Sequence, residues 1–215
     1  MQSALPSRAV LVADIVGSTR TRHVRALLAA RLRLASAAHL KEGLIRLPYA
    51  ITAGDEFQTV AAGLRHIPTL LFDLRRLMRP LQLRIGVGIG PILGPLRAPV
   101  NQLGGPAFEY ARIAMDEAKD ARAHSGKDTR FHSKNSQFDL LANLIYSLQD
   151  ALVGNPSKKQ WKTMDAYLDK GRVDLAARSL KINASTASRN LSRSHFWESQ
   201  ETMDVMKKLL DSSFP

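Results

Sequence analysis

Cysteine is absent from this chain of 215 residues. Its absence excludes disulfide bonds and any chemistry that needs a thiolate. Long apolar runs are also lacking: the first one, from Ala9 to Val12, gives way to Asp14 and is too short for a signal-peptide core or a membrane span. The chain contains no internal repeat and no low-complexity segment. We therefore expect a cytoplasmic protein without a membrane partner.

The composition is that of a packed protein with an uneven distribution of charge. Apolar residues make up 45% of the chain and charged residues 23%, which is typical of globular proteins. The length suits one sizeable domain and one small one. Of the net charge of +12, residues 1–135 carry +10, from 20 Lys and Arg against 10 Asp and Glu. Such an excess would suit a polyphosphate as well as a nucleic acid, so charge alone does not choose between them.

Hydrophobic spacing predicts an α+β domain over residues 1–135. The predicted strands and helices alternate along the chain: strand 9–13, helix 20–40, a hairpin within 44–62, helix 64–78, strand 81–89, helix 107–123 and strand 129–132. The hairpin has its tip at Gly54–Asp55. The resulting order βαββαβαβ contains a ferredoxin-like split βαβ core, with two helices packed on one face of the sheet.

Glycine is concentrated in one part of this domain. Six of the 13 glycines lie between Gly86 and Gly105, and those within strand 81–89 interrupt an otherwise apolar alternation. Glycine in a strand indicates that another backbone or a ligand comes close to it.

A polar segment at 133–137 marks the predicted domain boundary, which separates residues 1–135 from residues 136–215. Beyond it the spacing predicts only helices, at 138–152, 158–168, 173–180, 185–192 and 198–210. Within this small all-α domain, residues 174–191 resemble a helix-turn-helix. Ala177 lies where that motif needs a small residue between crossing helices, whereas Lys181 occupies the position where glycine usually makes the turn.

The second helix of this motif would be the one that meets DNA. Ser185 would be its N-cap. Four further side chains would be exposed on it and could reach phosphates and base edges: Thr186, Ser188, Arg189 and Arg193. The alternative is a helical bundle for packing or dimerisation, which the low net charge of +2 for residues 136–215 favours.

Two carboxylates in the first domain are candidates for a metal site. Asp14 ends the first strand and Asp55 lies at the hairpin tip, and in a split βαβ sheet that strand and hairpin are neighbours. Two close carboxylates repel unless a cation lies between them, and oxygen ligands suit Mg²⁺ bound together with phosphates. The turn at 15–19 would offer backbone N–H groups and a helix N-terminus to a triphosphate. Alternatively, Asp14 is a strand-end cap and Asp55 an ordinary turn residue; Glu56 either faces the metals or lies in solvent.

Four segments, in the expected order, resemble class III nucleotidyl cyclases. Residues 13–19 resemble the first metal motif of class III adenylyl cyclases, and residues 53–57 resemble their second metal motif and the signature loop of diguanylate cyclases. Residues 84–91 resemble the glycine-rich strand of the cyclases, and residues 104–112 lie where their last helix opens. Together with its helical tail, the chain is similar to the SatD family, whose members pair a cyclase-like domain with a C-terminal helical region.

The resemblance implies a nucleoside triphosphate ligand, ATP in the first place, bound with Mg²⁺ or with Mn²⁺ or Ca²⁺. It implies metal contacts from Asp14, Ile15 and Asp55. The nucleotide contacts that it implies come from both metal motifs and the last helix: Ile15, Val16, Gly17, Ser18, Thr19, Ile51, Gly54, Phe108 and Arg112.

The chain departs from active adenylyl cyclases at residues that serve turnover. Ile51 occupies the place of the base-selecting lysine, and the ribose-orienting asparagine falls on Phe108 or Glu109. Arg112 matches the catalytic arginine in one of the two registers. The loss of such donors removes transition-state stabilisation, while ground-state binding can survive. We therefore expect binding of a nucleotide with little or no cyclase activity.

Three functions compete at this point. The first is a nucleotide-sensing regulator, in which the helical module binds DNA or a protein in response to the nucleotide. The second is an active nucleotidyl cyclase, which would need a homodimer to complete its site. The third is an interaction protein with a vestigial pocket.

Overall fold

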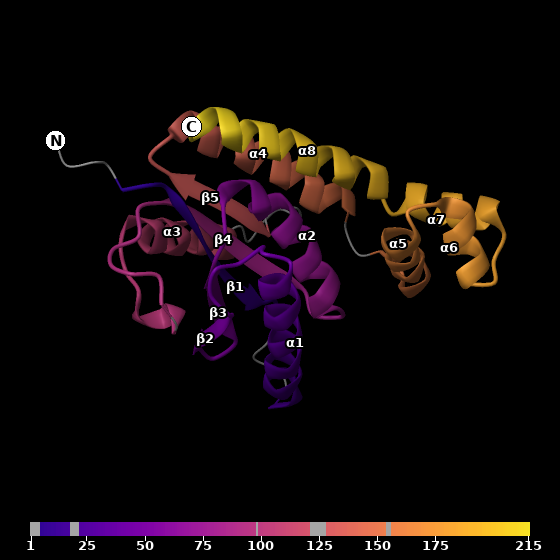
Figure 1. Cartoon of the computed structure of the whole chain (residues 1–215), viewed down its shortest axis with the longest axis horizontal. Helices are drawn as coiled ribbons and strands as arrows, with labels where there is room; N and C mark the ends of the chain where they lie inside the picture. The colour runs from indigo at the N-terminus through magenta and orange to yellow at the C-terminus, as the bar shows by residue number, and fades with distance from the viewer. Residues whose placement is uncertain (1–4, 18–21, 98, 121–127, 154–155) are drawn as a thin grey trace.

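The computed structural model describes residues 5–17, 22–97, 99–120, 128–153 and 156–215 of a mixed α+β protein (Figure 1). Its five strands are β1 (Arg8–Ile15), β2 (Ala50–Ala53), β3 (Glu56–Val60), β4 (Leu83–Gly90) and β5 (Thr129–Ser133). The helices of the first half are α1 (Arg22–Lys41), α2 (Ile67–Met78) and α3 (Pro106–Asp120). Those of the second half are α4 (Ser136–Val153), α5 (Lys158–Lys170), α6 (Val173–Ser179), α7 (Ala184–Arg193) and α8 (Phe196–Ser213).

The strands form one sheet in the order β2-β3-β1-β4-β5. Strand β1 pairs antiparallel with β3 and β4, while β5 is parallel to β4. The predicted order βαββαβαβ is confirmed, as is the hairpin with its turn at Gly54–Asp55. Strands β1 to β4 with α1 and α2 have the connectivity and directions of a split βαβ motif. The end of β1 therefore lies in the middle of the sheet, beside the hairpin.

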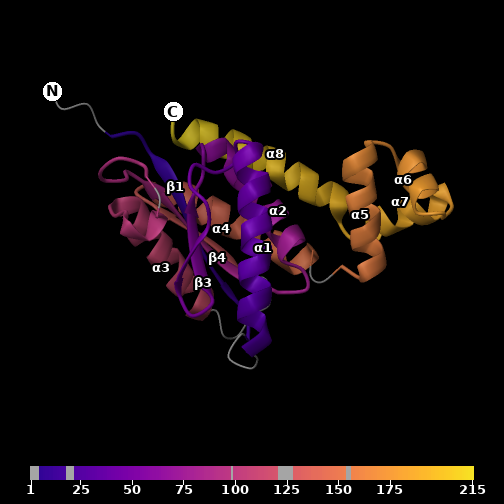
Figure 2. The ribbon, with the colours of Figure 1, turned by 60° about the horizontal axis from the view of Figure 1, so that its bottom comes forward.

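Alternation along β1 divides its side chains between two cores. Leu11 and Ile15 belong to the larger core, which includes residues of α1 and α2. Val10 and Val12 belong to a smaller core with Ala111 of α3. Helices α1 and α2 thus share one face of the sheet, as predicted, and α3 covers the other face (Figure 2). Asp14 has the parity of Val10 and Val12, so its side chain lies on the α3 face.

Glycines in β4 let α3 lie directly on the strand. A Cβ at Gly86 would come within 2.5 Å of the Ala111 carbonyl oxygen. A Cβ at Gly88 would come within 2.1 Å of the Ala107 carbonyl oxygen and of the Ala111 nitrogen. The close approach that these glycines predicted is therefore made by the backbone of a helix, and at these two positions no side chain of β4 lies between the strand and α3.

The core of the sheet continues across the predicted boundary at 135–136. Phe138 and Tyr146 of α4, and Met206 and Leu210 of α8, belong to the same buried cluster as the residues of β1, α1 and α2. All five helices predicted beyond residue 137 are present. Helices α5, α6 and α7 form a lobe beside the sheet (Figure 1), whose small core is centred on Met164.

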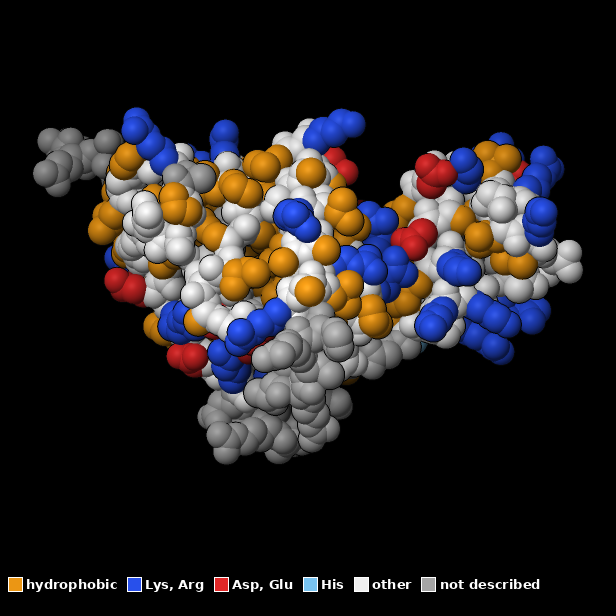
Figure 3. Space-filling view, turned by 90° about the horizontal axis from the view of Figure 1, so that it is seen from below, with side chains coloured by type: hydrophobic (Ala, Val, Ile, Leu, Met, Phe, Trp, Pro, Cys, Tyr) orange, Lys and Arg blue, Asp and Glu red, His pale blue; other side chains and the backbone are white. Residues whose placement is uncertain are grey.

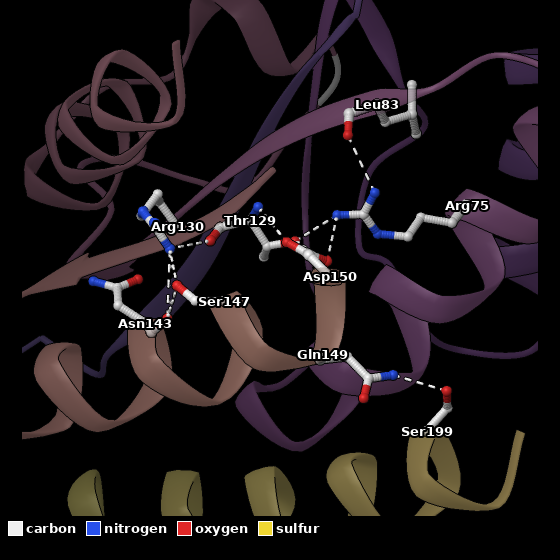
Figure 4. Close-up of polar contacts among 9 residues, drawn as sticks. All are labelled: Arg75, Leu83, Thr129, Arg130, Asn143, Ser147, Gln149, Asp150 and Ser199. Atoms are coloured by element: carbon white, nitrogen blue, oxygen red, sulfur yellow. Dashed lines mark hydrogen bonds and ion pairs between the residues drawn. The ribbon is translucent and has the colours of Figure 1, made fainter. Parts of the chain in front are cut away.

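A buried polar bridge ties α2 and α4 to neighbouring strands (Figure 4). Asp150 accepts hydrogen bonds from Arg75 Nη2, at 3.1 Å, and from the Thr129 backbone nitrogen, at 2.8 Å. Arg75 also donates to the Thr129 hydroxyl and to the Leu83 carbonyl oxygen. Burial raises the pKa of Asp150. The charge of Arg75 and the hydrogen bonds from Thr129 act in the opposite direction and reduce this rise. The bridge links α2, β4, β5 and α4, and so joins the two halves of the chain.

Helix α4 presents an apolar surface outwards as well as inwards. Its exposed leucines, which we call the α4 leucine face, are Leu140, Leu141, Leu144, Leu148 and Leu152. At 100° per residue they fall within one third of the helix circumference. Despite this face, no helix in the described part of the chain is long and apolar enough to span a membrane.

Candidate functional site

The structure brings Asp14 and Asp55 together at the end of β1. The Asp55 carboxylate accepts a hydrogen bond of 3.0 Å from the Ile15 nitrogen, which fixes the hairpin tip beside the residue that follows Asp14. Pairing of β1 with β3 places the start of β3 next to the same strand end. Because Glu56 begins β3, three carboxylates gather here. We call Asp14, Asp55 and Glu56 the carboxylate cluster.

Asp14 is the buried member that lacks a full set of partners. Its residue is 8% exposed, and its Oδ1 has no hydrogen bond among the described residues. Two cations lie near it: Lys119 Nζ at 3.5 Å from Oδ2, and Arg84 Nη1 at 3.9 Å from Oδ1. Burial raises the pKa of Asp14 and the charge of Asp55 adds to the rise, while Lys119 and Arg84 reduce it. The ionised form of Asp14 is therefore only partly compensated by the protein.

Glu56 is bound by a side chain of α3. It therefore does not lie in solvent, which was one of the two positions that the sequence left open for it. Arg112 donates to both of its carboxylate oxygens at 2.7 Å, a bidentate pair. Thr52 donates a further hydrogen bond at 3.1 Å, and Lys119 lies 3.5 Å away. Burial acts to raise the pKa of Glu56, but the hydrogen bonds and charge of Arg112 lower it overall. In turn the hydrogen bonds to Glu56 raise the pKa of Arg112.

The residues that could hold a divalent cation are Asp14 and Asp55. No group of three or more His, Asp or Glu side chains is placed for metal binding within the residues that the structure describes. A Mg²⁺ ion bound here would thus take its remaining ligands from phosphate oxygens and water, as Mg²⁺ sites with nucleotides commonly do. Asp14 Oδ1 fits this role, because a bound cation would contact this oxygen, for which the described residues supply no hydrogen-bond partner.

The backbone after β1 is partly occupied. The Ile15 nitrogen donates to Asp55, and the Val16 nitrogen donates to the Gln82 carbonyl oxygen at 3.0 Å. These two N–H groups therefore already have acceptors within the protein. Gly17 follows with a φ of 74°, a conformation that favours glycine. Ser18 and Thr19 lie outside the described residues.

The remaining predicted nucleotide contacts lie around the cluster in different environments. Ile51 on β2 is 43% exposed, and Gly54 makes the hairpin turn with a φ of 62°. Phe108 is partly buried and packs against the core on the α3 face. Arg112 is the one among them that contacts the carboxylate cluster.

Arg84 and Lys119 were not predicted as site residues. Arg84 of β4 lies opposite Asp14 of β1 in the sheet. This pairing depends on how the two strands are aligned. Lys119 lies two helical turns after Arg112 on α3, so both side chains leave the same face of the helix. That spacing is visible in the sequence and could have identified Lys119 once Arg112 was placed.

The predicted DNA-contact residues lie on α7, with one correction. The N-cap of α7 is Asn183, whose side chain makes no capping hydrogen bond, and Ser185 lies inside the first turn. Sequence favoured Ser185 because serine is a common cap, but the helix begins earlier, at Ala184. Thr186 is half-buried, and the other four side chains of the set are exposed: Ser185, Ser188, Arg189 and Arg193.

Comparisons with known proteins bear on both halves of the chain. A family model described as the SatD family matches residues 9–199. Among solved structures, the chain is similar to a bacterial light-regulated adenylyl cyclase, with 13% identity and a TM-score of 0.41 over 59% of this chain and 75% of that one. It is also similar to a regulator of polyketide synthase expression from Bifidobacterium adolescentis, with 14% identity and a TM-score of 0.28 over 97% of this chain and 84% of that one. No curated protein matches the sequence.

Proposed function

The chain belongs to the SatD family, and we propose that its carboxylate cluster binds a nucleoside triphosphate, ATP in the first place, together with Mg²⁺. One observation carries this proposal: Asp14 is buried and its Oδ1 has no hydrogen-bond partner in the described part of the chain, yet Asp55 is fixed beside it. A buried carboxylate next to a second one is unfavourable in the empty protein. A divalent cation would reverse that balance, because it favours the ionised form of both carboxylates.

The basic residues around the cluster would serve the phosphates. Lys119 and Arg84 lie within 4 Å of Asp14. A bound metal ion would neutralise Asp14 in their place. Their charges could then act on the phosphate oxygens, for which arginine and lysine are common partners. The carboxylate cluster would thus hold the metal, and Lys119 and Arg84 beside it would hold the triphosphate.

We propose further that turnover to a cyclic nucleotide is slight. Arg112, the residue that could stabilise charge in a transition state, is held by both oxygens of Glu56. Ile51 supplies no polar group for base selection, and neither Phe108 nor Glu109 can act as the ribose-orienting amide. Binding without these donors leaves the reaction barrier largely unchanged. An active cyclase would instead form cyclic AMP or cyclic GMP in amounts that Asp55→Ala abolishes.

Calorimetric titration with ATP and GTP, with and without Mg²⁺, tests the binding proposal. We expect Mg²⁺-dependent binding that Asp14→Ala and Asp55→Ala each weaken by at least about tenfold, since each removes a charged ligand of the metal. Glu42→Ala is the matched control, because Glu42 is an exposed acid just after α1, away from the cluster. Equal affinity in all four proteins would reject the metal site and favour an interaction protein with a vestigial pocket.

A second function, which we also propose, is DNA binding by the lobe of α5, α6 and α7. The supporting observation is the turn between α6 and α7, where Lys181 has a φ of 55°, the left-handed conformation that glycine usually supplies in such turns. Helix α7 then exposes Arg189 and Arg193, one turn apart. A salt series of DNA affinity tests this. Arg189→Ala with Arg193→Ala should weaken binding and flatten the salt slope by up to about two units.

The matched control for that experiment is Lys207→Ala with Lys208→Ala, which removes the same charge from α8. If both double variants bind DNA alike at every salt concentration, the lobe has no specific DNA-binding helix, and binding reflects the overall positive charge.

A further inference from the structure

A hollow of about 1020 Å³ lies between the sheet and α5, separate in its lining from Asp55 and Glu56. Its walls come from α2, the start of β4, the end of α3, α4, α5 and α8. The volume is at the upper end of the range for small-molecule sites. Figure 3 shows lysine and arginine side chains gathered around the hollow where the lobe meets the larger body. We call this hollow the interlobe pocket.

The charged residues of the interlobe pocket are mainly basic. They are Arg75, Arg79, Arg84, Lys119, Lys158 and Lys162, against Asp128 and Asp150. Arg75 is bound to Asp150, and Arg79 is bound to Asp165 and lies over the ring of Trp161 at 4.4 Å. These two arginines are therefore structural, and they attach α2 to α4 and to α5.

Of the other four cations, two have no partner among the described residues and two pair with the carboxylate cluster. Lys158 and Lys162 leave α5 one turn apart, and neither has a hydrogen bond or ion pair within the described ranges. Lys119 and Arg84 lie on the sheet side, at contact distances of 3.5 and 3.9 Å from Asp14. Cations that line one hollow repel each other, and an anion between them removes that repulsion.

The uncharged lining of the pocket includes a set of apolar and aromatic side chains beside the polar Gln149, Ser199 and Thr202. Leu71 and Phe72 of α2, Leu83 of β4, Trp161 of α5 and Met203 of α8 all line it. A free inorganic anion would leave these walls in contact with water, whereas an organic anion would cover them. From this combination of cations and apolar walls we propose that the interlobe pocket binds an organic phosphate with an aromatic or apolar body, without a metal ion.

The pocket and the carboxylate cluster share two cations. Arg84 and Lys119 line the pocket and also neutralise Asp14, so a phosphate in the pocket competes with Asp14 for them. Removal of the Asp14 charge should therefore strengthen binding in the pocket, although it should weaken the metal-dependent binding proposed above. This opposite response separates the two sites, and the pocket proposal does not rest on the nucleotide proposal.

Fluorescence titration with 1-naphthyl phosphate in buffer that contains EDTA tests the pocket. We expect saturable binding by the full chain. Lys158→Gln with Lys162→Gln should weaken it by at least about tenfold, because each lysine gives a charge-assisted contact to the phosphate. Lys159→Gln with Lys170→Gln is the matched control, since it makes the same charge change on the same helix outside the pocket. Asp14→Asn should strengthen binding, and Asp55→Ala should leave it within about twofold.

Some results of this titration would overturn the pocket proposal, and others would identify the natural ligand. Absence of saturable binding by the full chain, or equal affinity of the two lysine double variants, would overturn the proposal. Neutral 1-naphthol should bind far more weakly than the phosphate, and equal binding of the two would likewise overturn it. Displacement of the probe by adenosine monophosphate would support a nucleotide as the natural ligand. Displacement by dihexanoyl phosphatidic acid would support a lipid with the same phosphate chemistry.

A second inference rests on a different observation, the α4 leucine face. Its five leucines are between 40% and 70% exposed. Helix α4 contains no lysine or arginine, and its acids face inwards: Asp139 binds Ser133, and Asp150 binds Thr129 and Arg75. The chain has a net charge of +12, so two copies repel each other. The α4 leucine face carries no charge, and two copies that meet there bring no like charges together.

We infer that a second copy of this chain covers the α4 leucine face, α4 against α4 about a two-fold axis. Such an interface is self-complementary, since each copy presents the same neutral leucines. Helix α4 has 18 residues and is therefore about 27 Å long, which limits the contact to less than the roughly 800 Å² per partner of a standard interface. We therefore expect a dimer in the micromolar range.

Sedimentation velocity over a concentration series tests this dimer. Leu144→Glu with Leu148→Glu should give a monomer at every concentration. Leu34→Glu with Leu40→Glu is the matched control, with the same charge change on exposed leucines of α1, and should still dimerise. A monomeric parent protein, or the same behaviour of both double variants, would overturn the inference.

Discussion

Gly88→Ala is the substitution for which the structure makes the sharpest prediction. A Cβ at Gly88 would lie 2.1 Å from the Ala107 carbonyl oxygen and 2.1 Å from the Ala111 nitrogen, both in the backbone of α3. Ordinary contact begins at about 3.4 Å, so the helix and the strand must separate by roughly 1.3 Å. No rotamer change can relieve this clash, because neither contacting atom belongs to a side chain.

The expected loss of stability follows from that geometry. Overpacking of a well-packed core typically costs about 1–3 kcal/mol, and a contact between two backbones belongs at the upper end or above it. We therefore expect the free energy of unfolding to fall by about 3 kcal/mol or more, a large part of the total for an ordinary domain. The displacement would also move Arg112 and Lys119, since both lie on α3. Hydrogen bonds of 2.7 Å between Arg112 and Glu56 cannot survive a movement of that size unchanged.

Urea unfolding, followed by tryptophan fluorescence and circular dichroism, measures the effect. Gly104→Ala is the matched control, since a Cβ there meets nothing within 4 Å and Gly104 has no positive φ. Alanine lowers the entropy of the unfolded chain in both variants, so their difference isolates the clash. If Gly88→Ala is as stable as Gly104→Ala, α3 does not lie on bare strand backbone, and the packing described above is incorrect.

Three further substitutions test the charges and the backbone. Because the pKa of Asp14 is raised in the folded state, its ionised form lowers stability above that pKa; Asp14→Asn should therefore stabilise the protein more at about pH 7 than at about pH 4 in urea titrations. The pKa of Glu56 is lowered in the folded state, so its ionised form contributes to stability above the unfolded-state pKa. This contribution is lost as the pH falls through the folded-state pKa. Arg112→Ala should cost about 1–3 kcal/mol at neutral pH and weaken the acid-side dependence of stability, whereas an unchanged pH profile would contradict the pair. Lys181→Gly should raise the unfolding free energy by about 1 kcal/mol in thermal denaturation, since Lys181 has a φ of 55°; a lower melting temperature would argue against that backbone conformation.

Local patterns in the sequence were enough to predict most elements of the sheet. The apolar run of β1, the alternation of β4 and the turn at Gly54–Asp55 each follow from residues within a few positions of each other. The polar segment at 133–137 was interpreted as a domain boundary because it separates two periodic regions. In the structure it is a helix cap: Asn135 accepts a hydrogen bond from the Phe138 nitrogen, and Ser133 is bound by Asp139. Composition alone does not show that such a polar segment caps a helix.

Only the part of the candidate site that depends on which strands are neighbours could be predicted from the sequence. Asp14 and Asp55 could be placed together because a split βαβ sheet makes β1 and the hairpin adjacent. The bidentate pair of Arg112 with Glu56, and the position of Lys119, depend on how α3 lies across β4. That placement is set by the contact between the β4 glycines and the helix backbone, which are far apart in the sequence.

The position of α8 has a consequence for the order of events during synthesis. Met206 and Leu210 enter a core that Ala9 and Leu11 of β1 begin, so early and late parts of the chain close the same structure. While the ribosome is still making the intervening residues, the face of the sheet beside α2 lacks its last cover. The nascent chain must therefore carry exposed apolar surface until residue 210 has emerged, which is the kind of surface that chaperones bind in general.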